Sequence, residues 1–228
     1  MSDPSDSLPS DLAESSRPVS TPPPLTARGE RTRARLLAAA RTLFEEHGYL
    51  ATGVNEISAA AGVAYGTFYI YFSSKEEVCS EVVGDLHREM QRIATSEPHG
   101  STEPAALIER ANRGFFRAYQ QTARMQRVVE QAATVHPERA RERRAANRYW
   151  RERARRAITE WQIDGVVKRD IDAVYAANAL GAMVDRFAYV WFVLGEDHDF
   201  ETAVEQVTHL YCRALGIDHA LRRPDESR

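Results

Sequence analysis

The sequence predicts an all-α protein of about nine helices, and three observations support that prediction. From Arg28 onward, apolar residues recur at spacings of three and four, which places their side chains on one face of a helix. Glycine, proline and short polar residues stand between these periodic segments, where helices commonly end and begin. No segment has the convincing alternation of apolar and polar residues that is typical of a strand.

Four helices are expected in the N-terminal part of the chain, at residues 28–47, 52–61, 65–71 and 74–94. Gly48 suits the left-handed end of the first helix. Thr52 is the expected N-cap of the second, and Gly62 ends it. Ser73 or Ser74 is expected to cap the fourth, whose first turn holds two glutamates.

A break is expected at residues 95–104, and five more helices are expected after it, at 105–123, 124–135, 138–163, 172–194 and 200–215. His136 and Pro137 divide the second of these from the third. Asp170 or Asp172 is expected to open the helix that ends at Leu194. The acidic segment Glu196 to Asp199 suggests a metal, but Asp199 is well placed as an N-cap, which favours a loop.

Composition indicates a small N-terminal domain and a larger C-terminal one. The chain has 228 residues, of which 43% are hydrophobic, enough for a real core. Residues 1–26 are rich in Ser, Pro and Asp and are expected to be a disordered tail. We expect domains at 27–85 and 86–218, followed by a flexible tail at 219–228.

Several classes of protein are disfavoured. The net charge of −3 gives no global signal for nucleic acid, so any such signal must be local. Two cysteines without metal-ligand spacing argue against a disulfide framework or a zinc finger, and no cofactor or metal is expected. We find no catalytic motif, so we expect no enzyme. The N-terminus lacks the apolar segment of a signal peptide, and polar residues interrupt the apolar stretch 176–194, so we expect a cytoplasmic protein without a membrane span.

The segment "AGVAYGTFYIYFSSKEE", residues 61–77, is unusually rich in tyrosine. On a helix, Phe68 and Phe72 share one side and can anchor it in a small core, while Gly66 and several hydroxyls face the other way. A helix, a glycine-containing turn and a second helix form a helix-turn-helix, whose second helix enters the major groove. Half-buried aromatic residues of an ordinary small bundle would give the same pattern, and helix geometry alone leaves both interpretations open.

A family resemblance favours DNA binding. The runs "ARTLFEEHGYLAT" and "EISAAAGVAYGTFYIYFSSKEEV" resemble the DNA-binding domain of the TetR family of transcriptional regulators, over about residues 28–83. The resemblance implies a dimer that binds double-stranded operator DNA. Ala64 departs from the Ser or Thr that is common in the family, so the second helix lacks a side-chain N-cap. Gly66, Thr67, Tyr69, Tyr71 and Lys75 match family positions that meet DNA, and Thr52 matches a capping or phosphate-contacting position. Tyr65, at the start of the same helix, is expected to bind DNA with them.

The last two helices predict a homodimer. The final helix has a near-heptad apolar stripe, and the helix before it has one stripe of bulky side chains and a separate stripe of small ones. A helix with two apolar faces needs two partners, most simply its own core and a second subunit, although an intrachain bundle could bury both. The expected interface residues are Ala177, Gly181, Val184, Ala188, Val207, Leu210 and Tyr211.

The larger domain is dense in aromatic and methionine side chains, which could be plain core or could line an apolar pocket. Because the larger domain of the family usually encloses a ligand, we expect a small apolar or amphipathic effector, such as an acyl-CoA or a fatty acid. The arginine-rich run Arg139 to Arg156 could hold its anionic head, or could be a solvated helix face. The expected pocket residues are Phe115, Tyr119, Trp150, Met183 and Phe187.

These observations predict a ligand-responsive repressor that binds a palindromic operator as a dimer. The alternative is a helical adaptor protein in which the helix-turn-helix is architectural and no small-molecule inducer exists. DNA binding that resists competitor DNA and is released by a small molecule would separate the two.

Overall fold

The computed structural model describes residues 26–96 and 100–219, and in these ranges it contains eight helices and no strand. The predicted all-α class is therefore confirmed, and the number of helices is close to the predicted one. The predicted tails at residues 1–26 and 219–228 lie almost wholly outside the described residues. The helices are α1 (Ala27–His47), α2 (Val54–Ala60), α3 (Tyr65–Tyr71), α4 (Lys75–Ala94), α5 (Pro104–Val135), α6 (Pro137–Ile163), α7 (Ala173–Phe192) and α8 (Phe200–Leu215).

The helix α5 differs from the prediction, because one helix of 32 residues replaces the expected pair at 105–123 and 124–135. The residues at the expected division are good helix formers, with no glycine or proline among them. Thr122 and Met125 are buried, so the apolar face of the helix continues across this point. Only Pro137, after the C-cap His136, starts a new helix.

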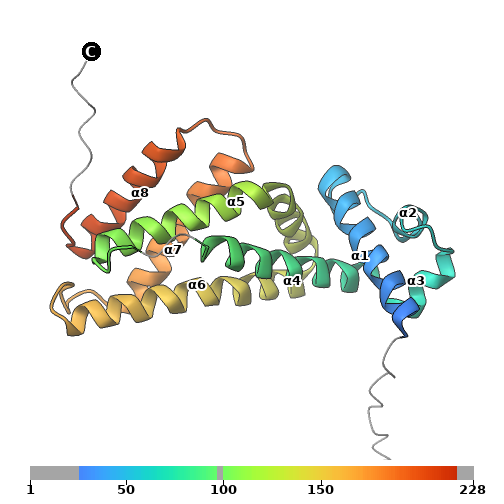
Figure 1. Ribbon diagram of the computed structural model, residues 1–228, viewed down its shortest axis with the longest axis horizontal. Helices are drawn as coiled ribbons and strands as arrows, with labels where there is room; N and C mark the ends of the chain where they lie inside the picture. Colours follow the sequence, from blue (N-terminus) through green and yellow to red (C-terminus); the bar gives the residue numbers. More distant parts are fainter. Residues whose placement is uncertain (1–25, 97–99, 220–228) are drawn as a thin grey trace, which may run out of the picture.

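The helices α1, α2 and α3 form a small bundle at one end of an elongated molecule (Figure 1). Its centre is made of fully buried side chains from all three helices, among them Leu36, Phe44, Ile57 and Phe68. Gly48, at the end of α1, has a φ of 84°, which only glycine adopts readily and which allows the chain to turn toward α2.

The helix α4 connects this bundle with the rest of the molecule (Figure 1). Ser74, one of the two predicted candidates, is its N-cap, and its hydroxyl accepts a hydrogen bond from the backbone N–H of Glu77. Two ion pairs hold α4 against α1, namely Arg33 with Glu81 and Arg41 with Glu89, the second with an N–O distance of 2.9 Å. The other side of α4 packs along α5.

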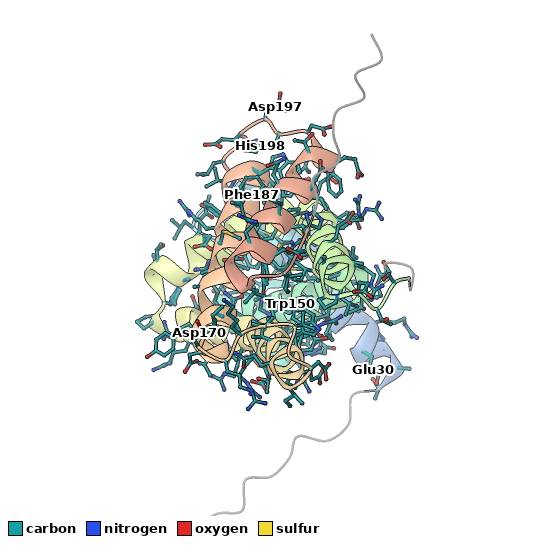
Figure 2. The ribbon with its side chains drawn as sticks, turned by 90° about the vertical axis from the view of Figure 1, so that its left-hand side faces the viewer. Glu30, Trp150, Asp170, Phe187, Asp197 and His198 are labelled. Carbon is teal, nitrogen blue, oxygen red and sulfur yellow. The ribbon has the colours of Figure 1, made fainter. Side chains whose placement is uncertain are left out.

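The helices α5 to α8 form the larger unit, in which α5 packs against each of the other three. Asp199 caps α8 as predicted, and Asp172, one of the two predicted candidates, caps α7. The Asp172 carboxylate accepts hydrogen bonds from the N–H groups of Val174 and Tyr175, and that of Asp199 accepts one from Thr202. An aromatic cluster of Phe116, Phe187 and Trp191 fills the space near the loop before α8 (Figure 2). Within the described residues, no helix is long and apolar enough to cross a membrane.

Candidate DNA-binding surface and internal cavity

The chain between α2 and α3 makes a tight turn that fixes the angle between the two helices. Gly62 has a φ of 64°, and the backbone N–H of Val63 donates to the carbonyl of Ser58 at 3.0 Å. The side chains of Phe68 and Phe72 are buried, as predicted, and hold α3 in the small core. The arrangement is a helix-turn-helix in which the second helix has one anchored face and one free face.

The free face of α3 carries two of the tyrosines that the sequence alone could not assign to the core or to the surface. Tyr65 and Tyr69 are 51% and 48% exposed, and their hydroxyl oxygens lie 2.9 Å apart. The two rings meet edge to face with centroids 5.3 Å apart, so they form one unit on the surface. A core role is therefore excluded for these two residues, whereas Tyr71 is half-buried against the core.

Gly66 follows Tyr65 in the first turn of α3 and lies on an open part of the surface. A Cβ added at this position would meet no atom within 4 Å. The glycine is therefore not required by packing inside the subunit, and its absent side chain leaves room for close approach of an external molecule. Thr67 is half-buried beside it, and Ala64 precedes the helix without a side-chain cap, as the sequence predicts.

The structure corrects the role predicted for Thr52. The N-cap of α2 is Gly53, whose backbone N–H donates to the Glu56 carboxylate at 2.7 Å. Thr52 is 1% exposed, and its hydroxyl donates to the carbonyl of Gly48 at 2.8 Å. It closes the turn after α1 from the inside, where it is not accessible to a phosphate.

Lys75 is also more internal than predicted. Its ammonium donates to the backbone carbonyls of Tyr49 and Thr52, at 3.0 and 2.9 Å. The same nitrogen lies 4.3 Å from the centroid of the Tyr49 ring, a cation–π distance. The charge of Lys75 therefore stabilises the turn between α1 and α2, and only one of its three N–H donors remains for DNA.

Sequence reasoning missed a row of arginines on α1. Arg28, Arg31 and Arg35 are exposed at a spacing that places them on one side of the helix. Arg33, in the same half of α1, has its guanidinium carbon 4.9 Å from the centroid of the Phe72 ring, so this half lies beside the end of α3. Exposed guanidinium groups next to a recognition helix are suited to bind phosphates. The helical spacing of these arginines was the signal in the sequence.

The larger unit encloses a cavity of about 400 Å³. Five helices contribute to its wall. The helix α4 contributes its last residue and the residue that follows, α5 contributes residues of its first half, and α6, α7 and α8 contribute residues from their middle or second half. The lining residues are Ala94, Thr95, Leu107, Ile108, Arg110, Ala111, Asn112, Phe115, Trp150, Arg153, Ala154, Ala157, Trp161, Gly181, Val184 and Tyr211.

Two of the five predicted pocket residues line this cavity, Phe115 and Trp150. Their rings meet edge to face with centroids 5.7 Å apart. Tyr119, Met183 and Phe187 are not among the lining residues, and this part of the prediction is wrong. Phe187 packs instead on Phe116, Trp191 and His198 in the aromatic cluster (Figure 2). Tyr119 is buried in the core, and burial raises its pKa.

The predicted dimer interface needs a larger correction. Ala177, Val184 and Ala188 are buried inside the subunit, as are Val207 and Tyr211. Gly181, Val184 and Tyr211 line the cavity. Of the seven predicted residues only Leu210 is exposed, at 57%. The stripe of small side chains on α7 therefore faces the subunit's own helices, because small residues allow α6 and α7 to approach closely.

The polar groups of the cavity are few. The Asn112 amide lies 3.1 Å from the hydroxyl of Thr208, and both residues are buried. Tyr211 is 8% exposed, and burial raises its pKa to about 12, so it is a neutral donor. Arg110 and Arg153 are the charged lining residues, and no carboxylate is among the lining residues. An anion is therefore favoured over a cation in this space.

The sequence left two roles open for the arginine-rich segment of α6, binding of an anionic ligand or a solvated helix face, and its arginines differ in which role they fit. Arg155 pairs with Glu152 one turn away at 2.6 Å, as expected for a solvated helix face, whereas Arg143 pairs with Glu130 of α5 at 2.6 Å and so joins two helices. Arg153 instead lines the cavity. The side chains of residues 138–140 and 142, which include two of the glutamates predicted to pair with this run, lie outside the described residues.

Within the described residues, no group of three or more His, Cys, Asp or Glu side chains is arranged to hold a metal ion. In the segment Glu196 to Asp199, the last residue is the N-cap of α8, and the His198 ring lies 3.4 Å from a Glu196 carboxylate oxygen.

Comparison with known proteins identifies the helix-turn-helix. Residues 36–82 match the family model described as bacterial regulatory proteins, tetR family. The chain is 28% identical over 205 residues to the HTH-type transcriptional repressor KstR2 of Rhodococcus jostii, a match that covers 87% of this chain and 99% of that protein. It is 35% identical over 72 residues to the HTH-type transcriptional regulator YdgC of Bacillus subtilis, where the match covers 32% of this chain and only 37% of that protein.

Solved structures agree with the fold of the whole chain. A TetR-like transcriptional regulator from Rhodococcus sp. RHA1 superposes with a TM-score of 0.64 at 18% identity, covering 85% of this chain and 99% of that one. A regulator of the TetR/AcrR family from Thermobifida fusca superposes with a TM-score of 0.61 at 26% identity, covering 78% and 95%. Residues 36–82 therefore form a DNA-binding domain of the tetR type, and the chain as a whole is similar in sequence and fold to TetR-family transcriptional regulators.

Proposed function

We propose that this protein is a repressor that binds a palindromic operator as a homodimer and releases it when a small apolar or amphipathic molecule occupies the cavity. It acts on DNA in the cytoplasm and carries out no catalysis. The observation that carries the proposal is the course of α4, which is anchored beside the recognition helix at one end and forms part of the cavity wall at the other.

The helix α4 gives the cavity a mechanical connection to α3. With 20 residues it is about 30 Å long. Its first turn follows Phe72, the buried anchor of α3, and its last residues, Ala94 and Thr95, line the cavity. Because a helix moves as a stiff rod, a ligand that displaces its C-terminal end also reorients α3.

The ligand must distinguish two arrangements of α4 for this coupling to work. A decrease of about 100-fold in operator affinity requires a coupling free energy of about 3 kcal/mol between the two sites. A ligand that fills the cavity equally well in both arrangements would bind without any effect on DNA. The effector therefore needs contacts with the movable wall formed by the end of α4.

On DNA, α3 enters the major groove with its N-terminal residues first. Gly66 allows close approach, and the hydroxyls of Tyr65 and Tyr69 reach base edges or phosphates. Arg28, Arg31 and Arg35 bind the phosphates beside the groove. Two subunits place two recognition helices about 34 Å apart, one turn of DNA, and the two-fold symmetry of the dimer makes the operator palindromic.

We place the dimer contact on the exposed faces of α7 and α8 rather than on the buried stripe. On α7, Tyr175, Ala179 and Ala182 lie on one exposed side, at spacings of four and three. On α8, the exposed side carries Leu210. Covering these side chains with the same surface of a second subunit would make an isologous interface.

The experiment is a selection of bound duplexes from a pool of random sequence, followed by binding measurements with the variant Gly66→Val. We expect enrichment of a palindrome and at least a tenfold loss of affinity in the variant, with an unchanged melting temperature, since the added side chain meets open space inside the subunit. The control Ala145→Val adds the same branched side chain at an exposed position of α6 and should bind like the wild type.

An adaptor protein would enrich no sequence in this selection, and its weak binding would not resist competitor DNA. Enrichment of a site without two-fold symmetry would contradict the dimer part of the proposal. Normal binding by Gly66→Val would contradict the placement of α3 in the groove.

A further inference from the structure

The residues around the cavity are specific enough to define the class of its ligand, an inference that rests on the proposed function. The apolar part of the wall is large. It includes Leu107 and Ile108 of α5, Trp150 and Trp161 of α6, and Val184 of α7. A volume of about 400 Å³ enclosed by such side chains fits an extended chain or a small ring system.

The second property of the wall is positive charge. Arg110 and Arg153 line the cavity from two different helices, and no acidic residue lies among the lining residues. In the part of the chain that the structure describes, no ion pair joins either arginine to a carboxylate, whereas Arg155 and Arg143 on the same helix are paired. Arg153 is exposed and Arg110 half-buried, so the charge lies toward the open side of the cavity.

The third property is a phenol hydroxyl that faces the cavity. Tyr211 lines the cavity from α8 and is 92% buried, being 8% exposed. Within residues 26–96 and 100–219, its hydroxyl has no hydrogen-bond partner. Asn112, which also lines the cavity, is hydrogen-bonded to Thr208 and not to Tyr211. Because this hydroxyl opens onto the cavity and is not used inside the protein, it can donate a hydrogen bond to an acceptor on the ligand.

From these three properties we infer that the cavity binds an anionic amphiphile whose apolar body carries one hydroxyl or keto oxygen. The anionic group, a carboxylate or the phosphate-bearing end of a thioester, meets Arg110 and Arg153 at the opening. The apolar body lies between Trp150, Trp161 and Leu107. The oxygen of the body accepts a hydrogen bond from Tyr211.

Binding is measured without DNA through the intrinsic fluorescence of Trp150 and Trp161, with Trp191 as a constant background outside the cavity. The probes are unbranched carboxylates from octanoate to tetradecanoate, their ω-hydroxy counterparts, and the alcohols and amines of the same lengths. We expect carboxylates to bind at least tenfold more tightly than the matched amines. At the best length, the ω-hydroxy acid should bind about three- to tenfold more tightly than the plain acid, the range for one neutral hydrogen bond.

The variants assign each preference to a residue. In Tyr211→Phe the advantage of the ω-hydroxy acid should disappear while the plain acid binds as before, and the control Tyr175→Phe changes an exposed phenol only. In the double variant Arg110→Gln/Arg153→Gln the carboxylate and the alcohol should bind alike, whereas Arg148→Gln, exposed on the same α6, should keep the preference.

Equal binding of acids and amines by the wild type would overturn the assignment of the arginines. A hydroxyl preference that survives in Tyr211→Phe would overturn that of the phenol, and saturation by none of the probes would overturn the ligand class. Release of operator DNA is measured separately. A probe that binds as expected without releasing DNA contradicts the proposed function alone.

Discussion

Lys75 illustrates how one side chain can fit two roles in a sequence. A lysine at the start of a helix next to a recognition helix matches a phosphate-binding position. In the folded chain its ammonium reaches back across the start of α4 to two carbonyls of the turn after α1. That turn also holds Tyr49, whose buried hydroxyl lies 3.0 Å from a carboxylate oxygen of Glu76. The lysine therefore belongs to a small polar network that joins α1 to α4.

We predict that Lys75→Met lowers the free energy of unfolding by about 1.5–3 kcal/mol, since two carbonyls lose hydrogen bonds to a charged donor. Urea denaturation measures this loss. The control Lys168→Met changes an exposed lysine in the loop after α6 and should stay within about 0.5 kcal/mol of the wild type. If Lys75→Met instead keeps full stability and reduces the salt slope of DNA binding by about one unit, the lysine binds a phosphate after all.

Thr52, which precedes the second helix, likewise fits two roles in the sequence. A threonine two residues before a helix looks like a cap, but Gly53 occupies the capping position, and the Glu56 carboxylate accepts its N–H. The threonine hydroxyl turns to the carbonyl of Gly48 because the turn after α1 leaves that carbonyl without a partner in the helix. Local sequence located the turn correctly and misassigned the residue that closes it.

At the scale of helices, α4 and α5 approach each other closely at Gly114. A Cβ added at Gly114 would lie 2.3 Å from the carbonyl oxygen of Ala94, well inside contact distance. Gly114 is therefore required where α4 and α5 cross. The crossing point lies at Ala94 of α4, which lines the cavity. The residue that sets the distance between α4 and α5 is thus also one that a ligand in the cavity would contact.

We predict opposite effects for two Gly→Ala changes. Gly114→Ala should lower the free energy of unfolding by about 1–3 kcal/mol, because backbone atoms must shift to admit the methyl group. Gly84→Ala, in the interior of α4, should raise it by about 0.5–1 kcal/mol, because the nearest atom is the mobile end of Arg88 and alanine favours the helix. Thermal and urea denaturation measure both. Equal effects of the two changes would contradict the close packing at Gly114.

At the scale of the whole molecule, the exposed apolar side chains of α7 and α8 need an explanation. Tyr175 is 77% exposed, and Leu210 is 57% exposed. Scattered apolar residues are common on protein surfaces, but these lie on the helices that the sequence predicted to form the dimer. The face of α7 that the sequence analysis predicted for the dimer is buried inside the subunit, so the exposed face with Tyr175 is the one left for a partner.

We predict that the wild-type protein sediments as a dimer at micromolar concentration and that Tyr175→Asp/Leu210→Asp sediments as a monomer, because a charge without a partner is costly in a buried interface. The control Leu194→Asp changes an equally exposed leucine in the loop after α7 and should remain a dimer. Gly181→Trp should remain a dimer as well and should instead block the cavity that Gly181 lines. A monomeric wild type would contradict the dimer itself.

The sequence by itself determined the features that depend on neighbours within about four residues. The cap Asp199, the turn at Gly62 and the anchors Phe68 and Phe72 follow from helix geometry, whose hydrogen bonds and side-chain contacts are local. For α4 and α7 the sequence narrowed the cap to two residues each, of which the structure has Ser74 and Asp172. The exposed tyrosines of α3 follow from the same geometry once the anchored face is known.

Only the tertiary structure decided which face of α7 is buried, where the cavity lies and which way Lys75 points. A helix with two apolar faces satisfies the periodic pattern in either orientation, and rotation about its axis is set by contacts with distant segments. The pairing of Asn112 with Thr208 joins residues 96 positions apart, and Lys75 reaches a carbonyl 26 positions away. Periodicity carries no information about such distances, because it describes each helix alone, and packing free energy belongs to the helices together.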